Sequence, residues 1–258
     1  MPTSTRFEHY KPAMLRLPPK GELTRNDLLT DAFRMAVEGR TEMYYAPHND
    51  WANDHARVAI IGITPGWTQM KLAYQAARAG LAEGLTDDEI CRLAKRKAGF
   101  AGPMRRNLIA MLDQLGLAEC MNLHSSAALF EEQGGLLHTT SLLKYPVFVQ
   151  GRNYGGSSPD MLASPLLRRE AAASAEELLT LPDALLIPLG RAVERILSRM
   201  AEQGQMQEER ILRGFPHPSG ANGHRHRQFL EQQEGMKKTM QTFFRQHAHD
   251  RRSTPKKS

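Results

Sequence analysis

The sequence predicts an α/β protein in three layers, with helices on both faces of a central parallel sheet of four strands. Short apolar runs with the length of buried strands recur along the 258 residues, and segments with apolar residues at helical spacing separate them. Strands that alternate with helices form parallel sheets, because each helix returns the chain to the same end of the sheet. A hydrophobic content of 41% is enough to bury one sizeable core.

The four strands are expected at apolar runs that are bounded by polar or turn residues and are too short for buried helices. These runs are Val58 to Ile63, Leu137 to Leu143, Ala184 to Leu189 and a shorter one from Arg210 to Phe215. Together they would form the central sheet.

Helices are expected where apolar residues recur every three or four positions. Such segments follow the first predicted strand, from Thr68 to Gly80, from Thr86 to Ala98 and from Met104 to Leu115. Three acids follow Thr86, which is typical of a helix start because carboxylates stabilise the positive end of the helix dipole. A further helix is predicted from about Arg25 to Glu38.

The chain is expected to form one main domain over residues 51–246. Residues 1–50 are predicted to be an N-terminal arm and a helix packed on this domain, since prolines and a lack of periodicity mark the first twenty residues. Residues 247–258 are polar and basic, and we predict a disordered tail there.

Composition excludes several classes of protein. The net charge of +6 and the pI near 9.4 favour a polyanionic partner, although proteins of many functions are as basic. Cys91 and Cys120 cannot build a disulfide framework or a four-thiolate cluster. No apolar run approaches the roughly 20 residues that span a bilayer, and the N-terminus lacks a signal-peptide core. We therefore expect a cytosolic protein with no membrane partner.

The residues that could take part in catalysis or binding are concentrated in two loops that follow predicted strands. Residues 60–67 read IIGITPGW, and residues 214–225 read GFPHPSGANGHR. Open α/β sheets bind their ligands at the carboxyl ends of the strands, where both loops would lie.

The two loops, in this order, resemble the active-site loops of the uracil-DNA glycosylase superfamily, and the resemblance spans roughly Arg57 to Arg227. It implies that superfamily's fold and a monofunctional DNA glycosylase. Such an enzyme flips a pyrimidine out of double-stranded DNA and hydrolyses its N-glycosidic bond to leave an abasic site. The resemblance further implies a monomer of the bacterial cytosol or nucleoid that needs no metal and no other cofactor.

In the first loop, Ile63 and Gly66 are expected to line the flipped base. Thr64 stands where the superfamily often has aspartate or asparagine, and its hydroxyl can bind a water but is not a general base near pH 7. Asp160 or Asp54 could supply that base instead, although either is better explained as a turn residue or helix cap. The strict uracil enzymes of the superfamily have tyrosine at the position of Gly66, so glycine is expected to leave the C5 edge of the pyrimidine open.

Three further residues are assigned to the base by the resemblance. Phe100 is expected to stack on it, which is worth roughly 1–3 kcal/mol. Ser141 stands where an asparagine reads uracil, and a hydroxyl cannot make the same paired contact. Asn153, in a polar loop, could replace the missing amide. Lys144, close to Ser141 in sequence, is assigned to DNA.

The second loop carries the strongest single motif. His217 is expected to donate a hydrogen bond to the base carbonyl on which negative charge develops. Ser219 and Asn222, with nearby backbone N–H groups, are assigned to the DNA backbone. A histidine between two prolines could also be purely structural.

The residues after this motif are small where strict uracil enzymes have a leucine wedge. His224 or Arg225 is the better candidate for insertion into the duplex, and Arg227 is expected to contact phosphate. The basic tail could help to hold DNA.

The departures at Thr64, Gly66 and Ser141 favour a bulky C5-modified pyrimidine over plain uracil. Glucosylated hydroxymethylcytosine in phage DNA is the first candidate, and it would place the protein in antiviral defence. Two alternatives stay open. The first is ordinary uracil or mismatch repair, and the second is a DNA-binding module that has lost catalysis.

Overall fold

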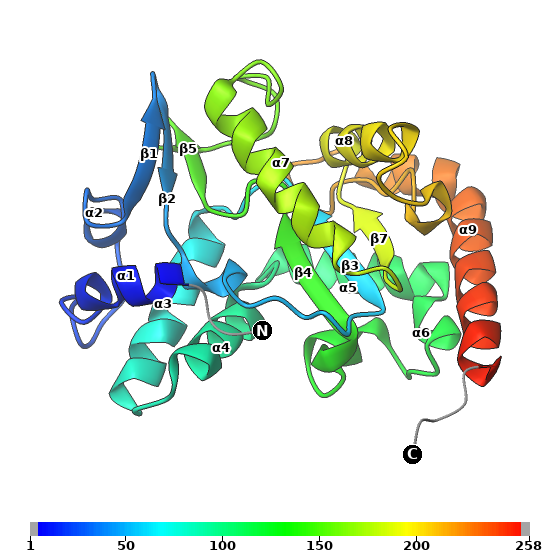
Figure 1. The fold of residues 1–258 in the computed structure, drawn as a ribbon, viewed down its shortest axis with the longest axis horizontal. Coiled ribbons are helices and arrows are strands. Elements are labelled where there is room, and N and C mark those ends of the chain that lie inside the picture. Colours follow the sequence, from blue (N-terminus) through cyan, green and yellow to red (C-terminus); the bar gives the residue numbers. More distant parts are fainter. Residues whose placement is uncertain (1–4, 254–258) are drawn as a thin grey trace. The chain divides into compact units, whose positions relative to one another are not determined.

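The structure is a computed structural model that describes residues 5–253, with side chains from Arg6 to His247. The chain divides into two compact units, each built from several segments (Figure 1). Unit 1 comprises Met1–Asp54, Gly62–Ala101 and Thr139–Leu178. Unit 2 comprises His55–Ile61, Gly102–His138 and Leu179–Ser258.

Unit 1 combines helices with a four-stranded antiparallel sheet in the order β1-β2-β5-β6. Its strands are β1 (Arg34–Glu38), β2 (Thr41–Tyr44), β5 (Val147–Val149) and β6 (Arg152–Asn153). Its helices are α1 (Thr5–Met14), α2 (Arg25–Leu28), the 3₁₀ turn η1 (Pro47–Asn49), α3 (Trp67–Ala82), α4 (Asp87–Ala98) and α7 (Pro165–Leu179), whose last residue belongs to unit 2.

The helix predicted from Arg25 to Glu38 is wrong. Helix α2 ends at Leu28, and β1 pairs with β2 across a turn in which Gly39 has φ 60°. Residues 34–38 and 41–44 each gain a hydrogen-bonded partner only when the chain reverses at this turn. Local periodicity does not register that pairing, so it favoured a helix.

A three-stranded sheet has the order β4-β3-β7, and it makes the protein mixed α/β as predicted (Figure 1). Strands β3 (Val58–Gly62) and β4 (Leu137–Ser141) have residues in both units, whereas β7 (Leu185–Pro188) lies in unit 2. Strand β3 runs parallel to β7, and every residue of β3, β4 and β7 is buried. Burial on both faces is typical of parallel strands and explains their continuous apolar runs.

The fourth predicted strand is reduced to one bridge, in which Ile211 pairs with Leu186. A 3₁₀ turn, η4 (Glu208–Arg210), precedes it, and Gly214 follows it with φ 87°. The backbone therefore turns away after one paired residue, and the sheet has three strands in the described part of the chain.

The other helices of unit 2 are α5 (Pro103–Leu115), α6 (Leu117–Cys120), η2 (Ser126–Phe130), η3 (Gly134–Leu136), α8 (Arg191–Glu202) and α9 (Arg225–Ser253). Helix α9 contacts α5 and α6. It continues through residues 247–253, so the prediction of disorder from residue 247 is wrong for that stretch, and residues 254–258 lie outside the described part. None of the described helices is both long and apolar enough to cross a membrane.

The predicted start of α4 is confirmed in detail. The Thr86 hydroxyl accepts a hydrogen bond from the Glu89 N–H, and the Glu89 carboxylate accepts one from the Thr86 N–H. These two bonds form a capping box, which satisfies N–H groups that have no partner inside the helix.

We predict that Thr86→Ala lowers the free energy of unfolding by about 1 kcal/mol, because the cap is lost. Urea unfolding followed by circular dichroism measures the change. Thr68→Ala is the matched control, since Thr68 is exposed in the first turn of α3 and caps nothing. Equal effects of the two substitutions would contradict the capping role.

Candidate functional site

The first predicted loop lies in unit 1, where it connects β3 to α3. Thr64 holds this loop to the segment that follows β4. Its hydroxyl donates to the Tyr145 carbonyl and accepts from the Val147 N–H, both at 3.0 Å. Because the hydroxyl donates its proton to a backbone carbonyl, it can only accept a hydrogen bond from a water, through its remaining lone pair. Thr64 is therefore placed to position the loop.

Gly66 and Asn153 lie together. A Cβ atom at Gly66 would lie 3.2 Å from Asn153 Nδ2, and Asn153 Oδ1 accepts a hydrogen bond from the Trp67 N–H at 3.0 Å. Asn153 thus caps α3 from another segment, and it occupies the space beside Gly66 that we expected to be open. The bond to Trp67 also orients the amide, so that Nδ2 is left as the donor group.

The position of Asn153 depends on the β5–β6 hairpin. Its two turn residues, Gln150 and Gly151, have φ 51° and 71°, which fits the type I′ turn of tight hairpins. Arg25 donates to the Gly151 carbonyl at 2.7 Å, and its guanidinium lies over the Trp67 ring. Arg25 therefore ties the hairpin to the start of α3.

Phe100 and Ser141 lie beside Gly62, as the resemblance implies for residues that share a base pocket. A Cβ at Gly62 would lie 3.2 Å from Phe100 Cε1 and 3.3 Å from Ser141 Oγ. Phe100 has φ 50°, which is strained for a residue with a side chain, and its ring is only 3% exposed. The ring is thus held in a fixed place inside unit 1, where a base would have to enter to stack on it. Ile63 lies nearby in the chain, against Gly156.

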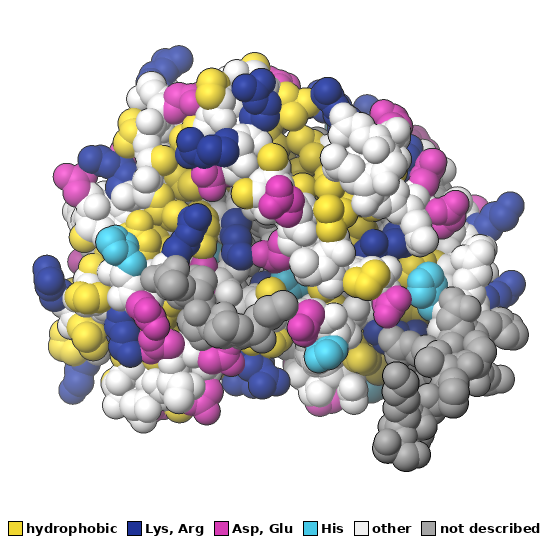
Figure 2. All heavy atoms as spheres, in the orientation of Figure 1, with side chains coloured by type: hydrophobic (Ala, Val, Ile, Leu, Met, Phe, Trp, Pro, Cys, Tyr) yellow, Lys and Arg dark blue, Asp and Glu magenta, His cyan; other side chains and the backbone are white. Residues whose placement is uncertain are grey.

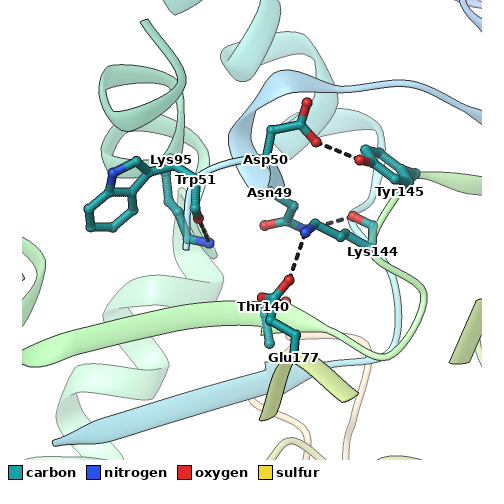
Figure 3. Close-up of polar contacts among 8 residues, drawn as sticks. All are labelled: Asn49, Asp50, Trp51, Lys95, Thr140, Lys144, Tyr145 and Glu177. Carbon is teal, nitrogen blue, oxygen red and sulfur yellow. Dashed lines mark hydrogen bonds and ion pairs between the residues drawn. The ribbon is translucent and has the colours of Figure 1, made fainter. Parts of the chain in front are cut away.

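Sequence reasoning missed a cluster of buried and half-buried charged and polar side chains in unit 1 (Figure 3). Lys144 Nζ lies 2.6 Å from Glu177 Oε2, and Thr140 donates to the other oxygen of Glu177 at 3.4 Å. Asn49 donates to the Lys144 carbonyl at 2.7 Å. Lys144, which we assigned to DNA, is therefore engaged in an ion pair inside the unit.

Asp50 anchors the same cluster. It is 7% exposed and accepts a hydrogen bond from the Tyr45 hydroxyl. It accepts another from the Tyr145 hydroxyl (Figure 3). Burial, and next the nearby Asp50 carboxylate, raise the pKa of both tyrosines, so they remain protonated donors. Asp50 is thus a buried carboxylate whose hydrogen bonds hold it in place.

Lys95 is buried on α4, and its Nζ donates to the Trp51 carbonyl at 2.7 Å (Figure 3). Burial lowers the pKa of Lys95 to about 7. The neighbouring His48 ring has no hydrogen-bond partner within the described residues, and burial followed by the charge of Lys95 lowers its pKa to about 3. The sequence contained a sign that Lys95 is buried. Lys95 follows Cys91 by four residues, which places it on the apolar side of its helix.

Asp160, the candidate general base, is exposed and acts as a cap. Its Oδ1 accepts from the N–H groups of Leu162 and Ala163 at 2.9 and 3.2 Å. This geometry matches the turn-residue explanation that we kept beside the catalytic one. Asp54 is likewise exposed.

The histidine loop lies in unit 2, between the Ile211 bridge and α9. His217 Nδ1 accepts a hydrogen bond from the Ser219 N–H at 3.3 Å, so the proton of the neutral ring is on Nε2. Burial lowers the pKa of His217, which favours this neutral form. Gly190, with φ 88°, passes close to the loop, because a Cβ there would lie 3.2 Å from His217 Cβ. His217 is therefore a fixed, neutral donor through Nε2.

Side chains hold the backbone of this loop. Asn107 donates to the Pro218 carbonyl at 2.9 Å, and Asn222 donates to the His217 carbonyl at 3.2 Å. Arg225 donates to the Ser219 carbonyl at 3.0 Å. Asn222 and Arg225, both assigned to DNA, thus use donors within the loop, and the Ser219 hydroxyl accepts from the Ala221 N–H.

His224 and Arg227 are exposed, and Arg227 lies 3.7 Å from Glu231 in a surface ion pair. Figure 2 shows Lys and Arg side chains interspersed with Asp and Glu over the face that it draws, without one continuous basic patch. The net positive charge of the chain therefore does not by itself locate a nucleic-acid surface on that face.

The chain is similar to a curated protein. The chain is 45% identical over 223 residues to a protein of Bacillus subtilis called uncharacterized protein YoxB, and the match covers 86% of this chain and 87% of that protein. No protein-family model matches the chain, and no solved structure matches it.

The low pKa of Lys95 predicts a pH dependence of stability. Between pH 7 and about pH 10 the unfolded chain binds a proton at this lysine and the folded chain does not, so stability rises with pH in this window. Lys95→Met removes that contribution. We expect the free energy of unfolding of the parent to rise, relative to that of Lys95→Met, by up to about 1.4 kcal/mol per pH unit from pH 7 to pH 10.

Urea unfolding of both proteins at pH 7, 8.5 and 10 checks this prediction. Lys97→Met, which changes an exposed lysine of the same helix, is the control and should track the parent. A constant difference between the parent and Lys95→Met at all three pH values would show that Lys95 titrates normally.

Proposed function

This chain belongs to the same family as YoxB, and from its two loops we propose that it is a monofunctional DNA glycosylase. It would flip a pyrimidine from double-stranded DNA and hydrolyse the N-glycosidic bond to leave an abasic site. The observation that carries the proposal is His217, because a half-buried neutral imidazole with its proton on Nε2 can act as a hydrogen-bond donor. We assign to it donation to an oxygen on which negative charge develops.

We propose that stabilisation of the leaving base supplies most of the catalysis. When the glycosidic bond breaks, the electron pair goes to the base and the sugar becomes cation-like. The hydrogen bond from His217 Nε2 becomes stronger as this charge grows, so it lowers the barrier. A water then adds to the sugar carbon and loses a proton to the solvent, while the released base takes up a proton from the solvent. Thr64 and Asp160 both use their polar atoms within the fold, so neither is assigned as the base that deprotonates this water.

Recognition of the base is assigned to unit 1. Phe100 and Ser141 lie together beside Gly62, and Asn153 offers its amide donors beside Gly66. An aromatic ring and two hydrogen-bonding groups form the kind of set that holds an extruded base.

The proposed substrate is a pyrimidine with a bulky C5 substituent, for which glucosylated hydroxymethylcytosine in phage DNA is the first candidate. A serine in place of a paired amide supports a base with other hydrogen-bonding groups than uracil. The proposal includes a three-layer α/β/α arrangement, a monomeric state and a place in the bacterial cytosol or nucleoid, with antiviral defence as the role.

A second candidate is a DNA-binding module without catalysis. It is favoured by two observations: the Thr64 hydroxyl is engaged by backbone groups, and the first loop carries no carboxylate. Such a module would bind DNA with the salt dependence of phosphate contacts and would release no base.

The test is incubation of the protein with DNA that contains uracil, a thymine mismatch, hydroxymethylcytosine or its glucosylated form, scored as alkali-labile sites. We expect cleavage of the glucosylated DNA, and a loss of roughly 100-fold in rate for His217→Ala, because one donor to the developing charge is removed. His226→Ala changes an exposed histidine and is the control. Cleavage at uracil alone would restore the repair function, and DNA binding without any cleavage would favour the inactive module.

Asn153 gives a second prediction, in which two substitutions separate recognition from the cap of α3. Asn153→Asp keeps an oxygen that accepts from Trp67 but loses the amide donors. Both Asn153→Asp and Asn153→Ala should lower kcat/KM on the preferred base by roughly tenfold, whereas only Asn153→Ala should lower stability.

Steady-state kinetics and urea unfolding check these two effects. Asn26→Ala, at an exposed asparagine of α2, is the control. An unchanged kcat/KM in Asn153→Asp would show that the amide only caps the helix.

A further inference from the structure

Three exposed arginines, Arg25, Arg40 and Arg152, gather at one end of the antiparallel sheet of unit 1 (Figure 1). Arg40 lies in the β1–β2 turn, and its carbonyl accepts a hydrogen bond from the Gln150 N–H of the β5–β6 turn at 3.0 Å. Arg152 directly follows the second turn, and Arg25 donates to the Gly151 carbonyl in that turn at 2.7 Å. The two turns therefore lie side by side, and we call the three arginine side chains the arginine end.

The arginine end surrounds the end of the sheet instead of covering one face. The Arg25 guanidinium lies over the Phe148 ring, with Cζ 5.5 Å from the ring centroid. Arg152 pairs with Val149 across the hairpin. Successive residues of a strand alternate between faces, so Arg152 lies on the face opposite Phe148. A polyanionic chain that passes across this end of the sheet can therefore contact cations on both sides of it.

The positive charge of the arginine end is not neutralised within the described residues. None of its three guanidinium groups is in an ion pair there, and only that of Arg25 donates a hydrogen bond. Carboxylates nearby in the sequence are engaged elsewhere. Glu38 uses both oxygens to accept at the start of α7, Asp27 accepts at the start of α2, and Glu42 lies 3.4 Å from the Arg34 guanidinium. Like charges repel one another, so an anion that binds here relieves that repulsion.

The spacing of the arginine end indicates a row of anions. Strand order places two strand spacings, or roughly 10 Å, between Arg40 and Arg152. Each strand of a DNA duplex carries one phosphate per about 3.4 Å of the helix axis. Guanidinium groups bind phosphate through paired N–H donors and keep their charge. Several adjacent phosphates match this spread of cations better than one small anion does.

We propose that the arginine end binds the phosphate backbone of double-stranded DNA, one strand of which passes across the two hairpin turns. The inference rests on the proposed function for the choice of DNA. Asn153 directly follows Arg152 and is bonded to the first loop, so the bound strand would lie beside the residues assigned to the base. The arginine end would also supply phosphate contacts in unit 1, where Lys144 is engaged by Glu177.

The experiment measures the affinity for a short duplex of unmodified DNA by fluorescence anisotropy at several salt concentrations. The variant combines Arg40→Gln with Arg152→Gln and leaves Arg25, which also holds the hairpin. Loss of two phosphate contacts should lower the slope of log K against log salt by about 1.8 and weaken binding roughly tenfold near 0.1 M salt. Arg152→Gln alone should lower the slope by about 0.9.

The matched control combines Arg16→Gln with Arg199→Gln, which removes the same charge at exposed arginines outside the arginine end. It should keep the slope of the parent. An unchanged slope in the variant or an equal fall in the control would overturn the proposal, and so would tighter binding of the parent to an RNA duplex of the same sequence.

The same proteins, scored for abasic sites on the modified and unmodified substrates, separate this inference from the proposed function. A fall in the slope without abasic sites on any substrate would retain the arginine end and refute the glycosylase. Abasic sites together with an unchanged slope would refute the arginine end alone.

Discussion

The structure around the first loop depends on how buried side chains satisfy the backbone of residues 144–147. Asn49 donates to the Lys144 carbonyl, and Thr64 both donates to the Tyr145 carbonyl and accepts from the Val147 N–H. A buried backbone group without a partner costs as much as a lost hydrogen bond, so these contacts are required once the segment is covered. They fix the segment that leads from β4 into β5, and with it the hairpin that carries Asn153.

The same principle governs the histidine loop, where carbonyls are held by Asn107, Asn222 and Arg225. A loop rich in glycine and proline has few regular backbone bonds of its own, and side chains replace them. The consequence for His217 is chemical, because the Ser219 N–H decides which ring nitrogen carries the proton. Hydrogen bonds within the loop thus hold its backbone in place and set the tautomer of His217. Electrostatic catalysis needs such a donor that is oriented in advance.

Unit 1 contains charged groups that do not serve the proposed chemistry directly. Asp50 and Glu177 are each engaged by donors, and Lys95 is buried against a carbonyl. Burying charges costs stability unless they are paired, and removal of one partner costs more than the pair contributes. We interpret the cluster as a specific anchor for η1 and for the segment after β4. Because this cluster lies beside the first loop, it helps to determine the position of Thr64.

The sequence alone predicted the elements that are decided locally. The strands β3, β4 and β7 and the helices α3, α4 and α5 lie within a few residues of their predicted positions, since burial on both faces, helical periodicity and a capping box are local patterns. The sequence also identified the two loops and assigned Phe100 and Ser141 to the same base, and in the structure these two residues lie together beside Gly62. Only the tertiary structure decided that β1 is a strand, that Asn153 fills the space at Gly66, and that Lys144 is paired with Glu177. Each of these depends on a partner far along the chain, and a hydrogen bond or ion pair between distant residues leaves no periodicity in the sequence.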